Sequence, residues 1–368
     1  MIFGEKIDAI SSATRSDEMD QKPLTLTFEP TPVPVSFLLT EEADTTRAAE
    51  QLGEFVGALA VKIGIPSEVI ERVVVADTAR YGDALAQFEG KREFTNSHGL
   101  LAVGKTIKVK GPKPVRSVII LNVAIVGAVL NAGRTKGWSV AQWSQEEQHS
   151  FYVIAHEIGH CADHLLREEI EDDGTWRDES GRRVTDAKFA NIHAYQFSMV
   201  YPEIAACVIS GANYTAEMRF VDATMSNASF LSMLRELETM TAADSRDLAE
   251  ICRQVGAVFW FVLFQHGKFV GSQIGNAKLE KASPSELWTI AKVIPDVADA
   301  LTRAETAIIE AWNRYPQIPP GLRTELTDCF HVLCQACGYS LEERGGQEGV
   351  WWNTFKRFTV RLLLERSR

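Results

Sequence analysis

The chain has no apolar run long enough to cross a membrane as a helix. Its two most apolar stretches, Val118–Leu130 and Ala257–Phe264, are shorter than the roughly 20 residues that a bilayer requires, and Asn122 interrupts the first. Met1–Lys22 mixes charged and hydroxyl side chains and does not resemble a signal sequence, so we expect a flexible tail over residues 1–22. The sequence therefore predicts a cytoplasmic protein without membrane partners.

The chain has few cysteines, and its 49 acidic residues outnumber its 38 lysines and arginines. Six cysteines in 368 residues, without a secretion signal, indicate reduced thiols more than a disulfide scaffold. The formal net charge of −11 makes attraction of the whole protein to nucleic acid or to an anionic membrane unfavourable, so no nucleic-acid partner is expected. Hydrophobic residues make up 45% of the chain, which is enough to build a substantial core.

One short motif carries most of the chemical information. The residues His156-Glu157-Ile158-Gly159-His160 form an HExxH pattern, in which the two histidines lie one helical turn apart and can share one metal ion. Glu157 lies beside them, where its carboxylate can take a proton from a zinc-bound water. The spacing therefore predicts one Zn²⁺ per chain, held by His156 and His160, with Glu157 as the base.

The residues around the motif predict the helix that this chemistry needs. Ser144 and Glu147 have the spacing of a capping box, so a helix should begin there. Apolar residues recur at three- and four-residue intervals, which would let one stripe face a core while the histidines face a cleft. That stripe consists of Phe151, Ile154, Ala155, Ile158 and Ala162.

The rest of the chain suggests two regions of different structure. Pro23–Leu39 indicates an extended entry segment with a strand at Leu24–Phe28, and Glu41–Ile63 has helical periodicity. Strands are then predicted at Val73–Val75, Leu100–Val109 and Arg116–Asn122, and a polar surface loop at Arg167–Lys188. Later segments indicate helices only: Tyr201–Ile209, Ala228–Met240, Leu248–Val262, Ser283–Asn313, Leu322–Glu342 and Trp351–Leu364. We expect an α+β core over residues 23–215 and a helical region over residues 216–368.

A third zinc ligand has to come from outside the motif. We expect Glu203, because Pro202 would open a second helix there and the small Ala205 and Ala206 would let that helix pack closely on the first. Asp178 is the next candidate, although it follows Gly174-Thr175 one residue too late for the GTxD element of aspartate-ligated zinc endopeptidases. His164 lies one turn beyond His160, where it is better placed to neighbour the metal site than to bind the same ion.

Taken together, these features resemble gluzincin-type zinc metallopeptidases, and within that group the arrangement is similar to the ImmA/IrrE-like peptidases. The resemblance covers about Leu100–Gly211 and depends on HEIGH in a capped helix, the strand before it and the Glu203 segment after it. It implies a zincin-like fold, the ligands His156, His160 and Glu203, and hydrolysis of a peptide or protein substrate by zinc-bound water that Glu157 activates. It also implies that substrate lies along an edge strand such as Leu101–Ile107.

Several assignments stay open at this point. A zinc-stabilised helical sensor or interaction protein without activity is the alternative function, although such a protein has no need of Glu157. Cys329, Cys334 and Cys337 with His331 could form a second zinc site, but their helical spacing favours buried cysteines. The aromatic and basic residues of 351–368 are expected to pack in a core with their charges at its rim. Four residues could stabilise an oxyanion, with no basis for choosing among them: His193, Tyr195, Tyr201 and Tyr214.

Overall fold

The structure, a computed structural model, describes most of the chain from residue 30 onward. The described residues are 30–89, 104–109, 114–168, 188–211, 223–242, 248–276, 287–344, 347–352, 356, 357, 360, 361 and 364. The expected tail over residues 1–22 and the expected strand at Leu24–Phe28 lie outside them. The chain divides into two compact units. The first contains the residues described up to 168, the end of one later helix from Ala205 and the end of another from Ser272, and the second contains the rest.

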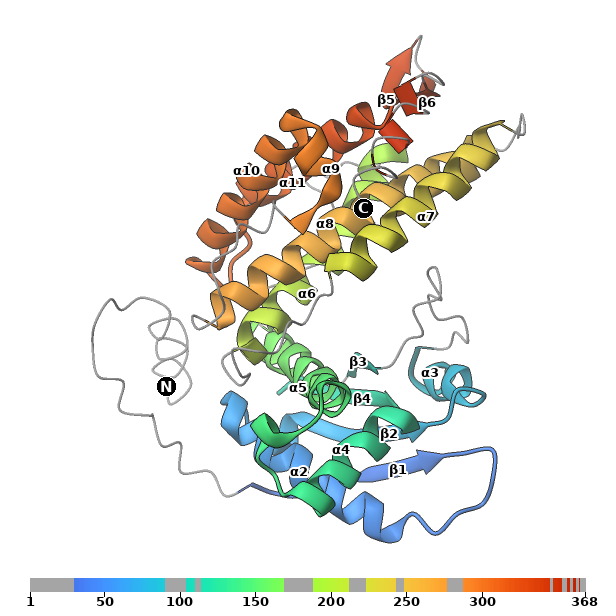
Figure 1. Cartoon of the computed structure of the whole chain (residues 1–368). Helices are drawn as coiled ribbons and strands as arrows, with labels where there is room; N and C mark the ends of the chain where they lie inside the picture. Colours follow the sequence, from blue (N-terminus) through green and yellow to red (C-terminus); the bar gives the residue numbers. More distant parts are fainter. Residues whose placement is uncertain are drawn as a thin grey trace. The chain divides into compact units, whose positions relative to one another are not determined.

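The first unit is built on a four-stranded mixed sheet with the strand order β1-β2-β4-β3 (Figure 1). β1, β2 and β4 are parallel, and β3 runs antiparallel to β4 at the edge of the sheet. The strands are β1 (Val35–Leu38), β2 (Ile70–Ala76), β3 (Gly104–Val109) and β4 (Arg116–Asn122). The helices are α2 (Thr46–Ile63), α3 (Tyr81–Glu89), α4 (Val123–Lys136) and α5 (Gln145–Leu166), with short 3₁₀ turns at Ser67–Val69 and Val140–Gln142.

Both faces of this sheet are covered, so its central strands are apolar on both sides. Val74 and Val118 belong to a cluster that includes the inner side of α3, while Val73 and Ile119 alternate with them and point to the opposite face. Helices α2, α4 and α5 pack on the sheet and on one another. This explains why the sequences of β2 and β4 are nearly continuous runs of β-branched and aliphatic residues and do not alternate strictly between apolar and polar residues.

The apolar stretch Val118–Leu130 is divided between two elements. Asn122 ends β4 and caps α4, because its side-chain oxygen accepts a hydrogen bond from the amide of Ala124 at 2.9 Å. A polar residue within an apolar run is therefore the boundary between strand and helix. The same connection brings the chain back across the sheet toward α5, the predicted motif helix.

The second unit is mainly helical. It contains most of α6 (Lys188–Gly211) and α8 (Leu248–Gly275), together with α7 (Ala223–Ala242), α9 (Thr289–Val293), α10 (Pro295–Trp312), α11 (Pro320–Ala336) and the hairpin of β5 (Tyr339–Arg344) and β6 (Gln347–Trp352). Its core is rich in aromatic rings, and Phe259 lies within 6.3 Å of Phe230, Phe330 and Tyr339 between ring centroids. The α+β prediction with a helical later region is thus confirmed.

Several predicted boundaries in this region are wrong. The helix expected over Ser283–Asn313 is divided at Ile294, because the residue before Pro295 is forced out of helical geometry and has φ −131° and ψ 102°. The expected opening of a helix at Pro202 is also wrong, since α6 begins at Lys188 and runs through that proline. Burial of Tyr201, Ile204 and the residues that follow offsets the backbone hydrogen bond that proline removes.

A β-hairpin replaces the ends of two predicted helices. Leu322–Glu342 and Trp351–Leu364 were expected to be helical, but α11 stops at Ala336 and Gly338 adopts φ 81°. The chain then forms β5 and β6, which pair from Tyr339 with Trp352 to Arg344 with Gln347. Both segments contain charged residues that are common in helices. Pairing between the two strands outweighs this local preference.

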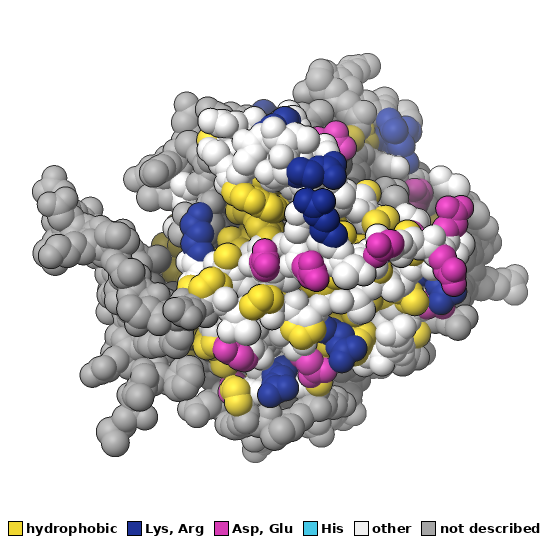
Figure 2. Space-filling view, turned by 90° about the horizontal axis from the view of Figure 1, so that it is seen from below, with side chains coloured by type: hydrophobic (Ala, Val, Ile, Leu, Met, Phe, Trp, Pro, Cys, Tyr) yellow, Lys and Arg dark blue, Asp and Glu magenta, His cyan; other side chains and the backbone are white. Residues whose placement is uncertain are grey.

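The surface of the protein does not present one dominant charge on the face seen in Figure 2. Acidic and basic side chains are interspersed there, with hydrophobic side chains between them. Among the described residues, every helix falls short of the length and apolar character that a membrane-spanning helix would need.

Candidate metal centre

Helix α5 carries the HExxH motif and is built as the sequence predicts. Ser144 accepts a hydrogen bond from the amide of Glu147 at 3.3 Å, and the Glu147 carboxylate accepts one from the amide of Ser144 at 2.7 Å. This capping box is confirmed. Lys136 also pairs with Glu147 at 2.6 Å, and these donors hold the pKa of the Glu147 carboxyl below its usual value.

Polar contacts with β3, β4 and the residue before β4 fix the rotation of α5 in its second half and just after its end. The Thr106 hydroxyl on β3 contacts Glu157, and the Ser117 hydroxyl on β4 lies 2.9 Å from Nδ1 of His164. Further along, the Glu168 carboxylate accepts a hydrogen bond from the amide of Val115 at 3.0 Å. Because these contacts sit on one side of the helix, α5 cannot rotate without breaking them.

The two motif histidines lie close together on α5. Their ring centroids are 4.7 Å apart and the rings are nearly perpendicular, at 81°. His156 is buried and His160 is half-buried. Nδ1 of His156 lies 3.4 Å from the hydroxyl of Tyr152 and 3.8 Å from Sγ of Cys207. Two neighbouring groups therefore restrict the orientation of the His156 ring.

Helix α6 approaches α5 closely at the motif itself. A Cβ atom on Gly159 would lie 2.7 Å from the carbonyl oxygen of Ala206, a distance that side chains do not tolerate. The absence of a side chain at Gly159 thus allows the two helices to touch through their backbones. The predicted close packing through Ala205 and Ala206 is confirmed for Ala206.

This helix contact brings the expected third ligand to the histidines. Cys207 touches His156, and Glu203 lies four residues earlier on α6, which is one turn along the same face of the helix. Candidate ligand atoms of His156, His160 and Glu203 all lie within 4.8 Å of one another. Among the described residues this is the only group of three or more histidine, cysteine or acidic side chains that could hold a metal ion.

Glu157 is buried beside this group, with 6% of its surface exposed. Its carboxylate oxygen Oε2 lies 2.8 Å from the Thr106 hydroxyl, which is also 2.9 Å from the Glu157 backbone carbonyl. The third member of the metal group, Glu203, forms an ion pair with Lys268 of α8 at 3.1 Å. Sequence analysis did not identify Thr106, Lys268 or Cys207, because their roles depend on contacts between separate elements, and it also missed Tyr152, which lies one turn before His156 on α5.

The other candidates for the metal centre have different outcomes. His164 does not belong to the metal group; it contacts Ser117, and burial lowers its pKa to about 4, so its ring is neutral near pH 7. Asp178 and Tyr214 lie outside the described residues, and the side chains of His193 and Tyr195 are not described. Tyr201 is buried in α6.

The cysteines singled out in the sequence and Arg357 are buried and pack in the interior of the protein. Cys329, Cys334 and Cys337 are buried, and burial raises the pKa of each thiol, which fits packed cysteines. Cys161 is also buried, and burial raises the pKa of its thiol, which disfavours a role as nucleophile. Near the C-terminus, Arg357 is buried over the Tyr339 ring, at 5.4 Å from its centroid, so its charge does not lie at the rim of the core as expected.

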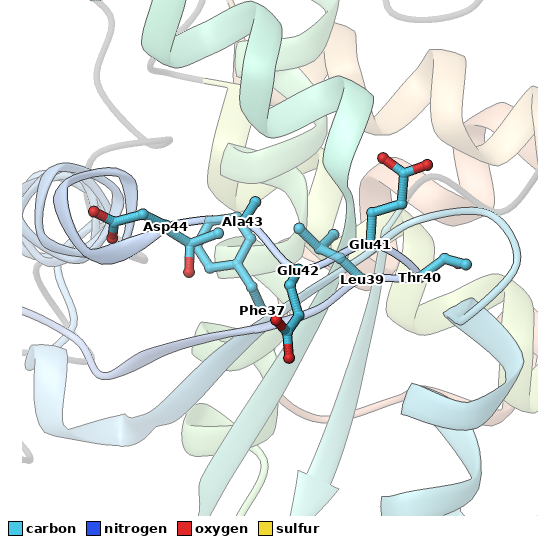
Figure 3. Close-up of a pocket in the computed structure, with 8 residues that line it drawn as sticks. Phe37, Leu39, Thr40, Glu41, Glu42, Ala43 and Asp44 are labelled. Atoms are coloured by element: carbon cyan, nitrogen blue, oxygen red, sulfur yellow. The ribbon is translucent and has the colours of Figure 1, made fainter.

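A hollow of about 520 Å³ lies at the end of β1. It is lined by Phe37 and the loop from Leu39 to Thr45. Figure 3 shows that the carboxylates of Glu41, Glu42 and Asp44 point in different directions, so they do not converge on a common ligand. This hollow contains no histidine and none of the residues of the HExxH motif.

Comparison of the chain with protein-family models, with curated proteins and with solved structures gave no match. The arrangement of the metal group is therefore the main basis for assigning a function. Two imidazoles and one carboxylate are a donor set that can hold a metal ion, and zinc in hydrolytic enzymes is one of the ions that it binds.

We predict that Gly159→Ala disrupts the metal centre by separating α5 from α6. The new methyl group cannot fit against the Ala206 carbonyl, so we expect a loss of about 1–3 kcal/mol in the free energy of unfolding and weaker zinc binding. Urea denaturation and zinc titration would measure both effects. Gly127→Ala in α4 is the control, because its Cβ would meet no atom within 4 Å and alanine favours a helix. Equal zinc affinity in Gly159→Ala and wild type would contradict this account.

Proposed function

We propose that the protein is a zinc-dependent metallopeptidase that cleaves peptide or protein substrates. The observation that carries this proposal is the convergence of His156, His160 and Glu203, with Glu157 buried beside them. The donor set fits zinc and leaves one coordination position for water or substrate. When bound, zinc would lower the pKa of water toward neutrality and polarise a peptide carbonyl.

In this proposal the residues of the chain have separate tasks. His156 would bind through Nε2, because its Nδ1 faces Tyr152 and Cys207. Glu157 would take a proton from the attacking water and pass it to the leaving amine. Lys268 would orient the Glu203 carboxylate by hydrogen bonding to Oε2, which favours ligation through the other oxygen. Among the described strands β3 is at the edge of the four-stranded sheet, and an extended substrate would pair along it, as the resemblance to zincins implies.

The test is zinc-dependent cleavage of an untargeted peptide library by the purified full-length protein. We expect about one zinc ion per chain, loss of cleavage after removal of the metal by a chelator, and recovery when zinc is restored. Product analysis by mass spectrometry would also reveal the preferred residues around the cleaved bond. Stoichiometric zinc without cleavage of peptides or unfolded proteins would overturn the proposal and would favour the alternative, a zinc-stabilised protein without catalytic activity.

A further inference from the structure

The strand β3 makes an unusual contact with the proposed base. The Thr106 hydroxyl lies 2.8 Å from Oε2 of Glu157 and 2.9 Å from the carbonyl oxygen of the same residue. A hydroxyl has a single proton to donate, so the two acceptors compete for it. A carboxylate accepts a stronger hydrogen bond than a neutral carbonyl, which favours donation to Oε2 when Glu157 is ionised.

A glycine on the same strand approaches the other part of this carboxyl group. A Cβ atom on Gly104 would lie 2.9 Å from Oε1 and 3.0 Å from Cγ of Glu157, and it would also meet Val153 at 3.0 Å. Residues 104 and 106 point to the same side of β3, because side chains alternate along a strand. The carboxyl group of Glu157 therefore lies between a hydrogen-bond donor and a glycine at which any side chain would push the carboxylate out of this position.

If Glu157 transfers protons, these contacts would hold its carboxylate in the position that the transfer requires. The Glu157 side chain has three rotatable bonds, so without constraints its carboxylate could occupy several positions relative to a substrate. Burial alone would fill the space around it but would not orient the two oxygens. A hydroxyl directed at Oε2 and a glycine backbone against Oε1 restrict both rotation and displacement.

We propose that Thr106 is a positioning residue for the base Glu157, and that Gly104 is required to leave room for the carboxylate in that position. The inference deepens the proposed metallopeptidase function and rests on it for its kinetic consequence. Edge strand β3 thus contributes to catalysis through its inward-facing side chains, separately from any pairing of its backbone with substrate.

The first test compares Thr106→Val with Thr106→Ser. Valine keeps the branched shape and removes the hydroxyl, whereas serine keeps the hydroxyl and removes a methyl group. We expect Thr106→Val to lower kcat about 10–100-fold with little change in KM or zinc content, and Thr106→Ser to retain kcat within a few-fold of wild type. Thr135→Val on α4 is the matched control, because it removes an exposed hydroxyl that donates to the Asn131 carbonyl.

Gly104→Ala gives a second test that does not remove any hydrogen-bonding group. The added methyl would displace the Glu157 carboxylate, and we expect a kcat loss similar to that of Thr106→Val. If the hydroxyl had only a structural role, Thr106→Ser and Thr106→Val would lower stability, and neither would lower kcat selectively while leaving KM unchanged. Wild-type kcat in both Thr106→Val and Gly104→Ala would overturn the proposal, as would an equal loss in Thr106→Ser and Thr106→Val.

Crystal structures of the zinc-loaded variants make the test independent of activity. In Thr106→Val we expect the Glu157 carboxylate to leave its position in the wild-type protein, and in Thr106→Ser we expect it to stay. A carboxylate that does not move in Thr106→Val would overturn the positioning role. If the wild-type protein binds zinc but cleaves nothing, the metallopeptidase proposal fails, while the carboxylate positions still decide whether Thr106 holds Glu157.

Discussion

Glu157→Gln is expected to abolish peptide cleavage while leaving zinc bound. Glutamine has the shape of glutamate and can still accept a hydrogen bond from Thr106, so the fold and the positions of His156 and His160 should remain unchanged. The amide cannot take a proton from water, and loss of a general base lowers rates by about 10²–10⁴-fold. Parallel measurement of kcat and of the zinc content of each chain would check this prediction.

The control for this experiment lies on the same helix. Glu146→Gln removes an exposed carboxylate from the first turn of α5, where it interacts favourably with the helix dipole. It should cost less than about 1 kcal/mol in stability and leave kcat unchanged. If Glu157→Gln retained a tenth or more of the wild-type kcat with full zinc, Glu157 would not be the base, and the tasks assigned to Thr106 and Gly104 would also fail.

Much of the first unit was predictable because its elements have strong local signals. β2 and β4 contain runs of β-branched residues, and the capping box at Ser144 marks the start of α5 to the residue. The helix expected over Glu41–Ile63 begins only at Thr46, because the residues before it form the loop around the hollow in Figure 3. Helix α3 was not predicted, since nine residues provide little periodicity.

The errors in the second unit arise where packing outweighs local preference. Pro202 reads as the beginning of a helix, yet α6 continues through it because the residues on both sides are buried. β5 contains leucine, glutamate and arginine, which favour helices, but its pairing with β6 and the burial of Tyr339 stabilise the extended form. These choices depend on residues that are distant in sequence, so a local pattern cannot determine them.

The candidate metal centre also combines residues that local sequence places with residues that only the tertiary fold places. The relation of His156, Glu157 and His160 follows from helix geometry and was evident from five residues. The position of Glu203 depends on how α6 crosses α5, and the sequence held only an indirect signal in the small residues Gly159 and Ala206. The contacts of Thr106 and Lys268 had no comparable signal, because a threonine in a strand and a lysine in a helix are common.

Replacement of the proposed zinc ligands is expected to have the second large effect. His156→Ala removes an imidazole, and Glu203→Gln removes the only carboxylate of the group and its negative charge. Changes in residues that merely orient ligands cost about 10–100-fold in metal affinity, so loss of a ligand should cost more than about 100-fold. Zinc content after dialysis against a weak chelator, together with competition titration, would measure the loss.

The same ligands can be tested by comparing how much zinc raises the free energy of unfolding of the wild-type protein and of each ligand variant. Zinc at 100 times its dissociation constant would stabilise the wild-type protein by about 2.7 kcal/mol, and neither ligand variant should show this gain at the same concentration. The metal-free stability of Glu203→Gln is not a suitable readout by itself, because this change also leaves Lys268 without the carboxylate of its ion pair. Subtracting the free energy of unfolding measured without zinc from the value measured with zinc removes the contribution of the lost ion pair.

Two variants outside the metal group serve as controls for this experiment. His149→Ala changes an exposed histidine two turns before His156 on α5, and Glu310→Gln changes an exposed carboxylate on α10. Both should bind zinc as tightly as wild type, because neither belongs to the cluster of ligand atoms. Full zinc affinity in Glu203→Gln with loss in His156→Ala would place the third ligand elsewhere, and Asp178 would be the next residue to replace. Full affinity in both variants would mean that the HExxH helix does not bind zinc, and the proposed peptidase mechanism would be wrong.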